Sequence, residues 1–122
     1  MTKIDLYLDD LRPCPPGFAL ARSAEECLLM VKECRIGILS LDYDLGWGAP
    51  NGMDVVRGLI ASGTFPDRIY LHTSSESGRR QMYEALYQSK PDRTELYAGP
   101  MPYEMLAERA AQAGKPSKKA KE

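Results

Sequence analysis

The chain has 122 residues, 16 of them basic and 17 acidic, which fits one domain with a formal net charge of −1. We expect a single domain over 1–113 and a basic, disordered tail over 114–122, whose four lysines against one glutamate leave the body near −4. The net negative charge of residues 1–113 argues against bulk DNA binding. The sequence shows no long apolar run and no signal-peptide core, which predicts a cytoplasmic protein without a membrane segment.

The first elements of the chain are two predicted strands on either side of a proline-rich loop. Apolar and polar residues alternate over Ile4–Leu8, which predicts a strand that ends in acid at Asp9-Asp10. Three prolines in 11–17 exclude a helix there and predict a short loop. Residues 18–21 then have the composition of a brief second strand.

A capping box begins the first predicted helix. Ser23 is the expected cap, with Glu26 reaching back to it, and apolar residues then recur at helical spacing to about Cys34. Cys27 and Cys34 fall on the apolar face, where we expect them to pack as small core residues. The three cysteines and the single histidine, His72, lack metal-ligand spacing, which argues against structural zinc and a disulfide framework.

The rest of the chain predicts further strands and helices in alternation. Ile36–Leu41 is a nearly unbroken apolar run, typical of a strand buried on both faces of a parallel sheet. The remaining predicted elements are a helix over 53–61 closed by Ser62-Gly63, a strand over 68–72, a helix over 79–88, a strand over 95–98 and a helix over 103–113. This alternation predicts an α/β fold whose ligands bind beyond the carboxyl ends of its parallel strands.

Polar side chains follow three of the predicted strands. Asp9 and Asp10 follow the first strand, Asp42 and Asp44 follow the third, and the residues 72–74 end the fourth. Carboxylates brought together repel one another, and a hard divalent cation, Mg²⁺ or Mn²⁺, relieves this repulsion. A bound cation attracts phosphate, so the sequence predicts phosphoryl chemistry or phosphate binding at this edge of the sheet.

Each of these candidates also has a structural interpretation. The hydroxyls of Thr73, Ser74 and Ser75 could bind phosphate oxygens together with the amides of the 73–78 turn. His72 is either a general acid/base or a strand-end histidine satisfied by a backbone carbonyl. Arg12 is either a phosphate clamp or a surface partner of the neighbouring acids.

Three further residues carry a weaker signal. Asp44 either joins the metal ligands or only shapes the turn before Gly46. Asp54 falls in the first turn of a helix, where a carboxylate favours the helix dipole, and we expect its role to be structural. Trp47 lies in the loop that follows the acids and could line the site.

The pattern resembles the receiver domain of response regulators over residues 3–112. The resemblance rests on the Asp9-Asp10 pair, on Asp42, on 50–52 before a helix and on Thr73-Ser74. It implies a flavodoxin-like, five-stranded parallel sheet in the order 2-1-3-4-5. It also implies that the acids hold Mg²⁺, that the central Asp42 accepts a phosphoryl group, and that the hydroxyl after the fourth strand responds to this phosphoryl group.

Two features depart from the receiver pattern. Loop residues 11–17 replace the helix that a receiver has between its first two strands, and 98–100 read Ala-Gly-Pro where a receiver has a lysine. The missing helix predicts an uncovered sheet face beside the first strand, solvated or used in a homodimer. The missing lysine disfavours a conventional phosphorelay.

Four short motifs are similar to a receiver-like family named for cyclic-phosphate processing. They are L-D-D-x-R-P at 8–13, L-D-Y-D-L-G at 41–46, N-G-x-D at 51–54 and H-T-S-S at 72–75, where the family more often has His-Ser-x-Asn. The resemblance implies a metal-assisted site that acts on, or binds, a phosphate ester.

Three functions from different classes follow from these patterns. The first is a metal-dependent hydrolase of a cyclic phosphate, on a small molecule or an RNA end, with Asp9, Asp10, Asp42 and Asp44 as metal ligands. In it His72, Asp42 and Arg12 are the catalytic candidates. The second is a non-catalytic pseudo-receiver module that binds a partner or ligand. The third is a toprim-like nuclease, although that family has a glutamate where this chain has Asp9.

Overall fold

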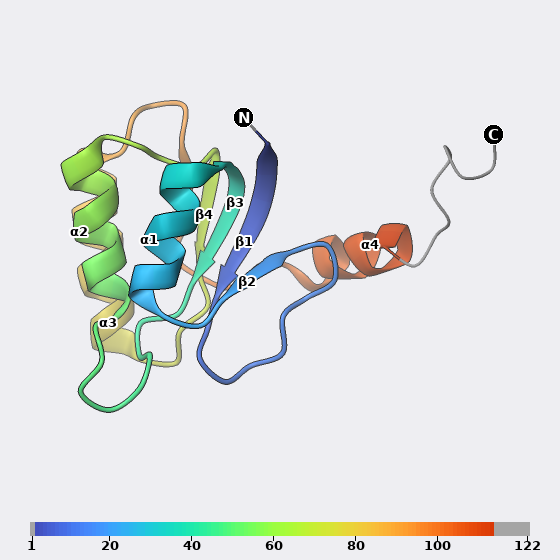
Figure 1. Cartoon of the computed structure of the whole chain (residues 1–122), viewed down its shortest axis with the longest axis horizontal. Coiled ribbons are helices and arrows are strands. Elements are labelled where there is room, and N and C mark those ends of the chain that lie inside the picture. Colours follow the sequence, from blue (N-terminus) through green and yellow to red (C-terminus); the bar gives the residue numbers. More distant parts are fainter. Residues whose placement is uncertain (1, 114–122) are drawn as a thin grey trace.

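A computed structural model describes residues 2–113 and shows a five-stranded, all-parallel sheet in the order β2-β1-β3-β4-β5 (Figure 1). The predicted tail, 114–122, lies outside the described residues. The elements are β1 Lys3–Leu8, β2 Ala19–Ala21, α1 Ala24–Glu33, β3 Arg35–Leu41, α2 Gly52–Ser62, β4 Arg68–Leu71, α3 Glu76–Ser89, β5 Glu95–Tyr97 and α4 Tyr103–Ala113. The predicted fold class and strand order are therefore confirmed.

The main core lies between the sheet and α1, α2 and α3, which all cover one face (Figure 1). Leu39 and Leu41 of β3 are fully buried beside Leu8 of β1 and Leu71 of β4. Burial on both faces explains the unbroken apolar run of the central strand, as a parallel sheet requires. No helix within residues 2–113 has the length and apolar character needed to cross a membrane.

Side-chain caps fix where two of these helices begin. The Ser23 hydroxyl accepts the backbone N–H of Glu26, as expected. The Glu26 carboxylate, however, accepts the N–H of Arg22 and not that of Ser23, so the expected reciprocal capping box is not formed. Ser75 accepts from the N–H of Gly78, and α3 therefore begins three residues before the predicted start.

The second face of the sheet is partly covered, which corrects the expectation of an open face. Helix α4 lies on this side of the sheet, away from the other helices (Figure 1). Its Met105 and Leu106 pack against a small cluster that contains Tyr7, Ile38 and Tyr70. The homodimer through this face stays a prediction.

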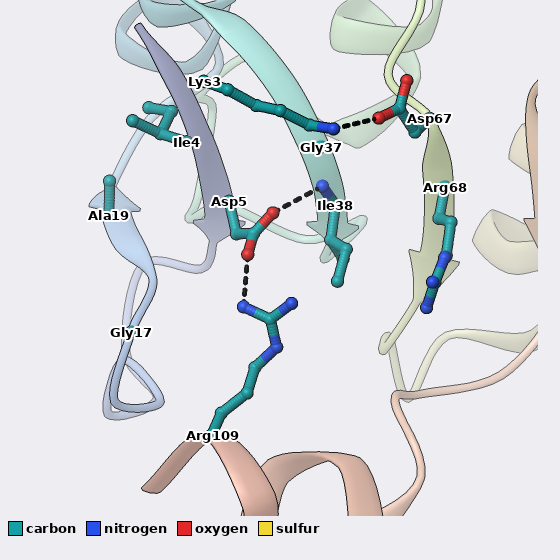
Figure 2. Close-up of a pocket in the computed structure, with 10 residues that line it drawn as sticks. All are labelled: Lys3, Ile4, Asp5, Gly17, Ala19, Gly37, Ile38, Asp67, Arg68 and Arg109. Carbon is teal, nitrogen blue, oxygen red and sulfur yellow. Dashed lines mark hydrogen bonds and ion pairs between the residues drawn. The ribbon is translucent and has the colours of Figure 1, made fainter. Parts of the chain in front are cut away.

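A cavity of about 490 Å³ remains where α4 leaves the sheet uncovered (Figure 2). Asp5 fills a break in strand pairing between β1 and β3, because its carboxylate accepts the N–H of Ile38 at 2.8 Å. The same carboxylate pairs with Arg109 of α4, as Figure 2 shows. A polar residue in the middle of β1 thus ties α4 to the sheet.

Candidate functional site

Asp9, Asp42 and His72 each follow one of three adjacent strands. The ladder of the sheet continues one residue beyond the strand ends, since Asp42 N–H donates to the carbonyl of Leu8 at 3.1 Å and His72 N–H to that of Leu41 at 3.0 Å. One ligand atom from each of the three side chains lies within 4.8 Å of the others. The convergence expected at the carboxyl edge is therefore present.

Asp9 is buried and surrounded by donors. Its Oδ1 accepts the backbone N–H groups of Leu11 and Arg12 at 2.9 and 2.8 Å. Its Oδ2 lies 2.8 Å from Arg12 Nη1 and 3.0 Å from His72 Nε2. Burial alone would raise the pKa of Asp9, but these hydrogen bonds outweigh it and lower the pKa to about 2. Asp9 is thus an ionised carboxylate at neutral pH.

Asp42 is also buried, but its pKa shifts in the opposite direction. Its Oδ1 accepts the N–H of Tyr43 at 2.8 Å. Burial and the neighbouring charge of Asp9 raise the pKa of Asp42, against the lowering effects of the Thr73 hydroxyl, His72 and Arg12. Neighbouring carboxyl groups whose pKa values are pushed apart are typical of functional sites.

Arg12 bridges the two acids. Its Nη1 is 2.8 Å from Asp9 Oδ2 and 3.3 Å from Asp42 Oδ2, so one positive charge stands between the carboxylates. The Arg12 side chain is 43% exposed, which leaves part of the guanidinium open to a ligand. Arg22, which the sequence did not single out, donates to the carbonyls of Asp9 and Arg12 and holds the loop in place.

His72 is enclosed by protein groups. Its Nδ1 is 2.6 Å from Ser40 Oγ, its Nε2 faces Asp9, and its ring stacks on Tyr7 with centroids 4.4 Å apart. Burial lowers the pKa of His72, against the raising effects of Asp9 and Asp42. Both ring nitrogens are engaged, so His72 holds Asp9 in place in this arrangement. The sequence placed neither Ser40 nor Tyr7 at the site.

Of the other predicted site residues, some line the cavity beside Asp9 and Asp42, and others are hydrogen-bonded within turns of the chain. Asp10 and Ser74 line the same cavity as Asp9, Arg12 and Asp42, together with Asp44 and Trp47. Asp44 is exposed, and its carboxylate accepts the N–H of Gly46 at 3.4 Å. Thr73 is buried and accepts the N–H of Ser75, whose own hydroxyl caps α3. The Thr73 and Ser75 hydroxyls are thus already engaged within the protein.

The N-G-x-D motif positions the loop behind the acids. Asn51 and Asp54 form a reciprocal capping box at the start of α2, which fits the structural role expected for Asp54. Gly52 donates its N–H to the carbonyl of Tyr43 at 2.7 Å, and a Cβ at this position would collide with the Asp42 carbonyl oxygen. The glycine therefore lets α2 approach the backbone of the acid loop.

The donor set fits a divalent cation. Two carboxylates and an imidazole are within reach of one point, and Asp10 lies on the same cavity. Carboxylates suit Mg²⁺ and Mn²⁺, while an imidazole ligand favours a transition metal such as Mn²⁺ over Mg²⁺. A cation bound between the carboxylates would take the place of the Arg12 guanidinium, which would then be free to pair with a phosphate.

Comparisons with known proteins agree with the fold and identify the family. A solved chain described as a yeast trimeric coiled-coil segment fused to another protein aligns with a TM-score of 0.51 and 13% identity, over 92% of this chain and 78% of that one. At this identity the likeness shows the fold alone. A comparison with curated proteins finds no significant match. The family model described as the cyclic-phosphate processing receiver domain matches residues 4–88, and the chain belongs to this family.

Proposed function

We propose that the chain is a metal-dependent phosphoesterase that opens a cyclic phosphate with water. The observation that carries this proposal is the meeting of Asp9, Asp42 and His72 within 4.8 Å, beside the partly exposed guanidinium of Arg12. Membership of a cyclic-phosphate processing family supports the phosphate-related part of the proposal. Metal dependence and hydrolysis are our own inference from the residues.

The reaction adds one water across one phosphorus–oxygen bond. The water oxygen joins phosphorus, one ring oxygen leaves, and this oxygen takes up a proton to become a free hydroxyl. The product is a phosphate monoester. One former ring oxygen still joins phosphorus to carbon, and the other is the oxygen of the new hydroxyl. The overall balance needs only water, so no redox partner or second substrate is involved.

The residues of the chain divide this work. Asp9, Asp42 and His72 would hold the cation, with Asp10 as a further oxygen ligand. Arg12 would pair with the non-bridging phosphate oxygens through its planar fork, and Ser74 would donate to them from the cavity wall. The cation, when bound, supplies positive charge that polarises the phosphate and lowers the pKa of water.

A second function is favoured by one observation. Arg12 already places a positive charge between Asp9 and Asp42, as a bound cation would. With this internal cation the site could bind an anionic ligand without catalysing its hydrolysis, as a pseudo-receiver module would. The two functions differ in whether a metal binds at all.

The deciding experiment is a calorimetric titration of the protein with Mn²⁺ and Mg²⁺. We expect binding by the wild type and its loss in Asp42→Asn, while Asp92→Asn, which alters an exposed carboxylate before β5, binds normally. The same proteins are then incubated with Mn²⁺ and a panel of nucleoside and sugar cyclic phosphates. A folded wild type that binds no metal and leaves the panel unchanged would remove the hydrolase and leave the binding module.

A further inference from the structure

The cavity above the acids has an apolar side that the proposed chemistry does not use. Trp47 and Leu11 both line it, and both side chains are highly exposed, Leu11 at 83% and Trp47 completely. Exposed large apolar side chains that share one concave surface typically mark a binding site. An exposed tryptophan in particular offers a flat face for stacking.

Trp47 lies in a tight turn between two glycines. Gly46 and Gly48 on either side have φ values of +114° and +73°, which residues with a Cβ rarely adopt. The turn is closed by the N–H of Ala49, which donates to the carbonyl of Gly46 at 3.3 Å, and Asp44 accepts the N–H of Gly46. The two glycines and these hydrogen bonds therefore define the turn that carries Trp47.

The size of the cavity also indicates a ligand larger than phosphate. Its volume is about 760 Å³, within the range of small-molecule binding sites, and its wall carries Asp9, Arg12 and Asp42 as well as Trp47. A phosphate held by Arg12 would occupy only the charged part. The apolar part is then available to the group that the phosphate esterifies.

We propose that Trp47 determines specificity by stacking on a flat aromatic ring of the phosphate ester, with a nucleobase as the ring that fits this chemistry. Every nucleobase has a face that can stack on an aromatic side chain. This contact therefore selects for the presence of a base without distinguishing one base from another. The inference rests on the proposed function for the phosphate end of the ligand. It adds which class of ester the site prefers.

The test compares two cyclic phosphates, of which only one carries a nucleobase on a ribose. Adenosine 2′,3′-cyclic phosphate carries a nucleobase, whereas glycerol 1,2-cyclic phosphate has the same five-membered ring without one. Trp47 is the single tryptophan of the chain, so its fluorescence reports directly on the proposed contact. With Mg²⁺ present, we expect the adenosine ester to change this fluorescence, and the glycerol ester to leave it nearly constant.

Affinities measured by calorimetry provide the second readout. Trp47→Ala should reduce the preference for the adenosine ester over the glycerol ester by about tenfold, and Trp47→Phe should retain most of it. Tyr87→Ala removes another exposed aromatic ring, on α3 and outside the cavity lining, and serves as the matched control.

The outcomes separate this inference from the proposed function. If both esters bind and Trp47→Ala keeps the wild-type preference, the stacking inference is wrong, while the phosphate site stands. If neither ester binds to the folded wild type, both proposals fail together. A short RNA with a terminal 2′,3′-cyclic phosphate, measured in parallel, shows whether the base belongs to a free nucleotide or to an RNA end.

Discussion

Ser40, a fully buried residue of β3, has its Oγ 2.6 Å from His72 Nδ1. On the other side of the ring, Nε2 faces Asp9, which is ionised and can only accept a hydrogen bond. Nε2 therefore carries the proton, and the Ser40 hydroxyl donates to Nδ1. A bound cation on Nε2 would require the other tautomer, and the Ser40 hydroxyl can accept as well as donate, so the same residue supports both states.

The first prediction concerns Ser40→Ala. The substitution leaves Nδ1 of a buried histidine without its partner, which should cost about 1–3 kcal/mol in the free energy of unfolding. Denaturant titration measures this cost, and nitrogen NMR of the imidazole should still show the Nε2–H tautomer, because the Asp9 carboxylate can only accept a hydrogen bond. Ser40→Cys, which keeps a weak donor of similar size, should fall between wild type and Ser40→Ala. An Nδ1–H tautomer in Ser40→Ala would contradict the assignment.

The second prediction concerns pH. Burial lowers the pKa of His72 in the folded protein below the usual 6.5, so the unfolded chain binds this proton more tightly. As the pH falls below about 6.5, the unfolded state takes up the proton first and the free energy of unfolding decreases. Across this window stability should therefore rise with pH, as denaturant titrations of metal-free protein at several pH values would show.

His72→Gln is the control for this pH dependence. His72 is the single histidine of the chain, so the variant should lose most of the slope near pH 6. The raised pKa of Asp42 acts in the opposite direction, because stability falls as pH rises from the usual 3.8 toward the folded value. Subtracting the variant's curve from that of the wild type isolates the histidine. Equal slopes in the two proteins would show that His72 is not held neutral.

The third prediction concerns Gly78 in the first turn of α3. Alanine normally stabilises a helix relative to glycine, but a Cβ at Gly78 would collide with the ring of Tyr43. We expect Gly78→Ala to lower the free energy of unfolding by about 1–3 kcal/mol and to weaken metal binding, since Tyr43 adjoins Asp42. Thermal unfolding and Mn²⁺ titration measure the two effects.

Gly58 in α2 provides the matched control for Gly78. A Cβ there would meet the flexible end of Leu28, with the nearest atom at 2.6 Å, and this side chain can move aside. Gly58→Ala should therefore cost less than Gly78→Ala and leave metal affinity unchanged. The double variant Tyr43→Leu/Gly78→Ala replaces the ring by a smaller side chain and should restore part of the stability that Gly78→Ala loses. Equal costs at the two glycines would show that the Tyr43 ring is not rigid.

The sequence was sufficient for the sheet and for the convergence of acids, because both follow from local patterns. Strand periodicity and the apolar run of β3 predicted the parallel sheet, and the position of Asp9 and Asp42 after their strands predicted that they meet. The helix starts were predicted less closely, because the caps Asn51 and Ser75 place the starts of α2 and α3 one and three residues before the predicted positions 53 and 79.

The partners of His72 could not be predicted because they depend on which strand lies next to which, at what register. Ser40 reads as one polar residue in an apolar strand, and only the pairing of β3 with β4 brings it to His72. Asp5 reads as one polar residue in the first strand, and the sequence did not predict that it completes a break in the β1–β3 ladder and pairs with Arg109. Contacts between residues distant in sequence decide both cases.

The last prediction tests what Arg12 does. Its guanidinium lies between Asp9 and Asp42, where a cation would bind, so metal binding must displace it. Arg12→Gln removes this competing charge and should tighten Mn²⁺ binding about tenfold, while weakening the binding of phosphate esters by a similar factor. Calorimetry with Mn²⁺, and with glycerol 1,2-cyclic phosphate at saturating Mg²⁺, measures the two affinities separately. Circular dichroism confirms that the variant is folded.

Arg12→Lys separates charge from shape in the same experiment. Lysine keeps the positive charge but lacks the planar fork, so it should compete with the metal nearly as well as arginine and bind phosphate less well. If Arg12→Gln leaves Mn²⁺ affinity unchanged, the cation does not bind between the two carboxylates. If it abolishes Mn²⁺ binding in a folded protein, Arg12 organises the acids for the metal instead of competing with it. Opposite changes in the two affinities would support its dual role as internal cation and phosphate clamp.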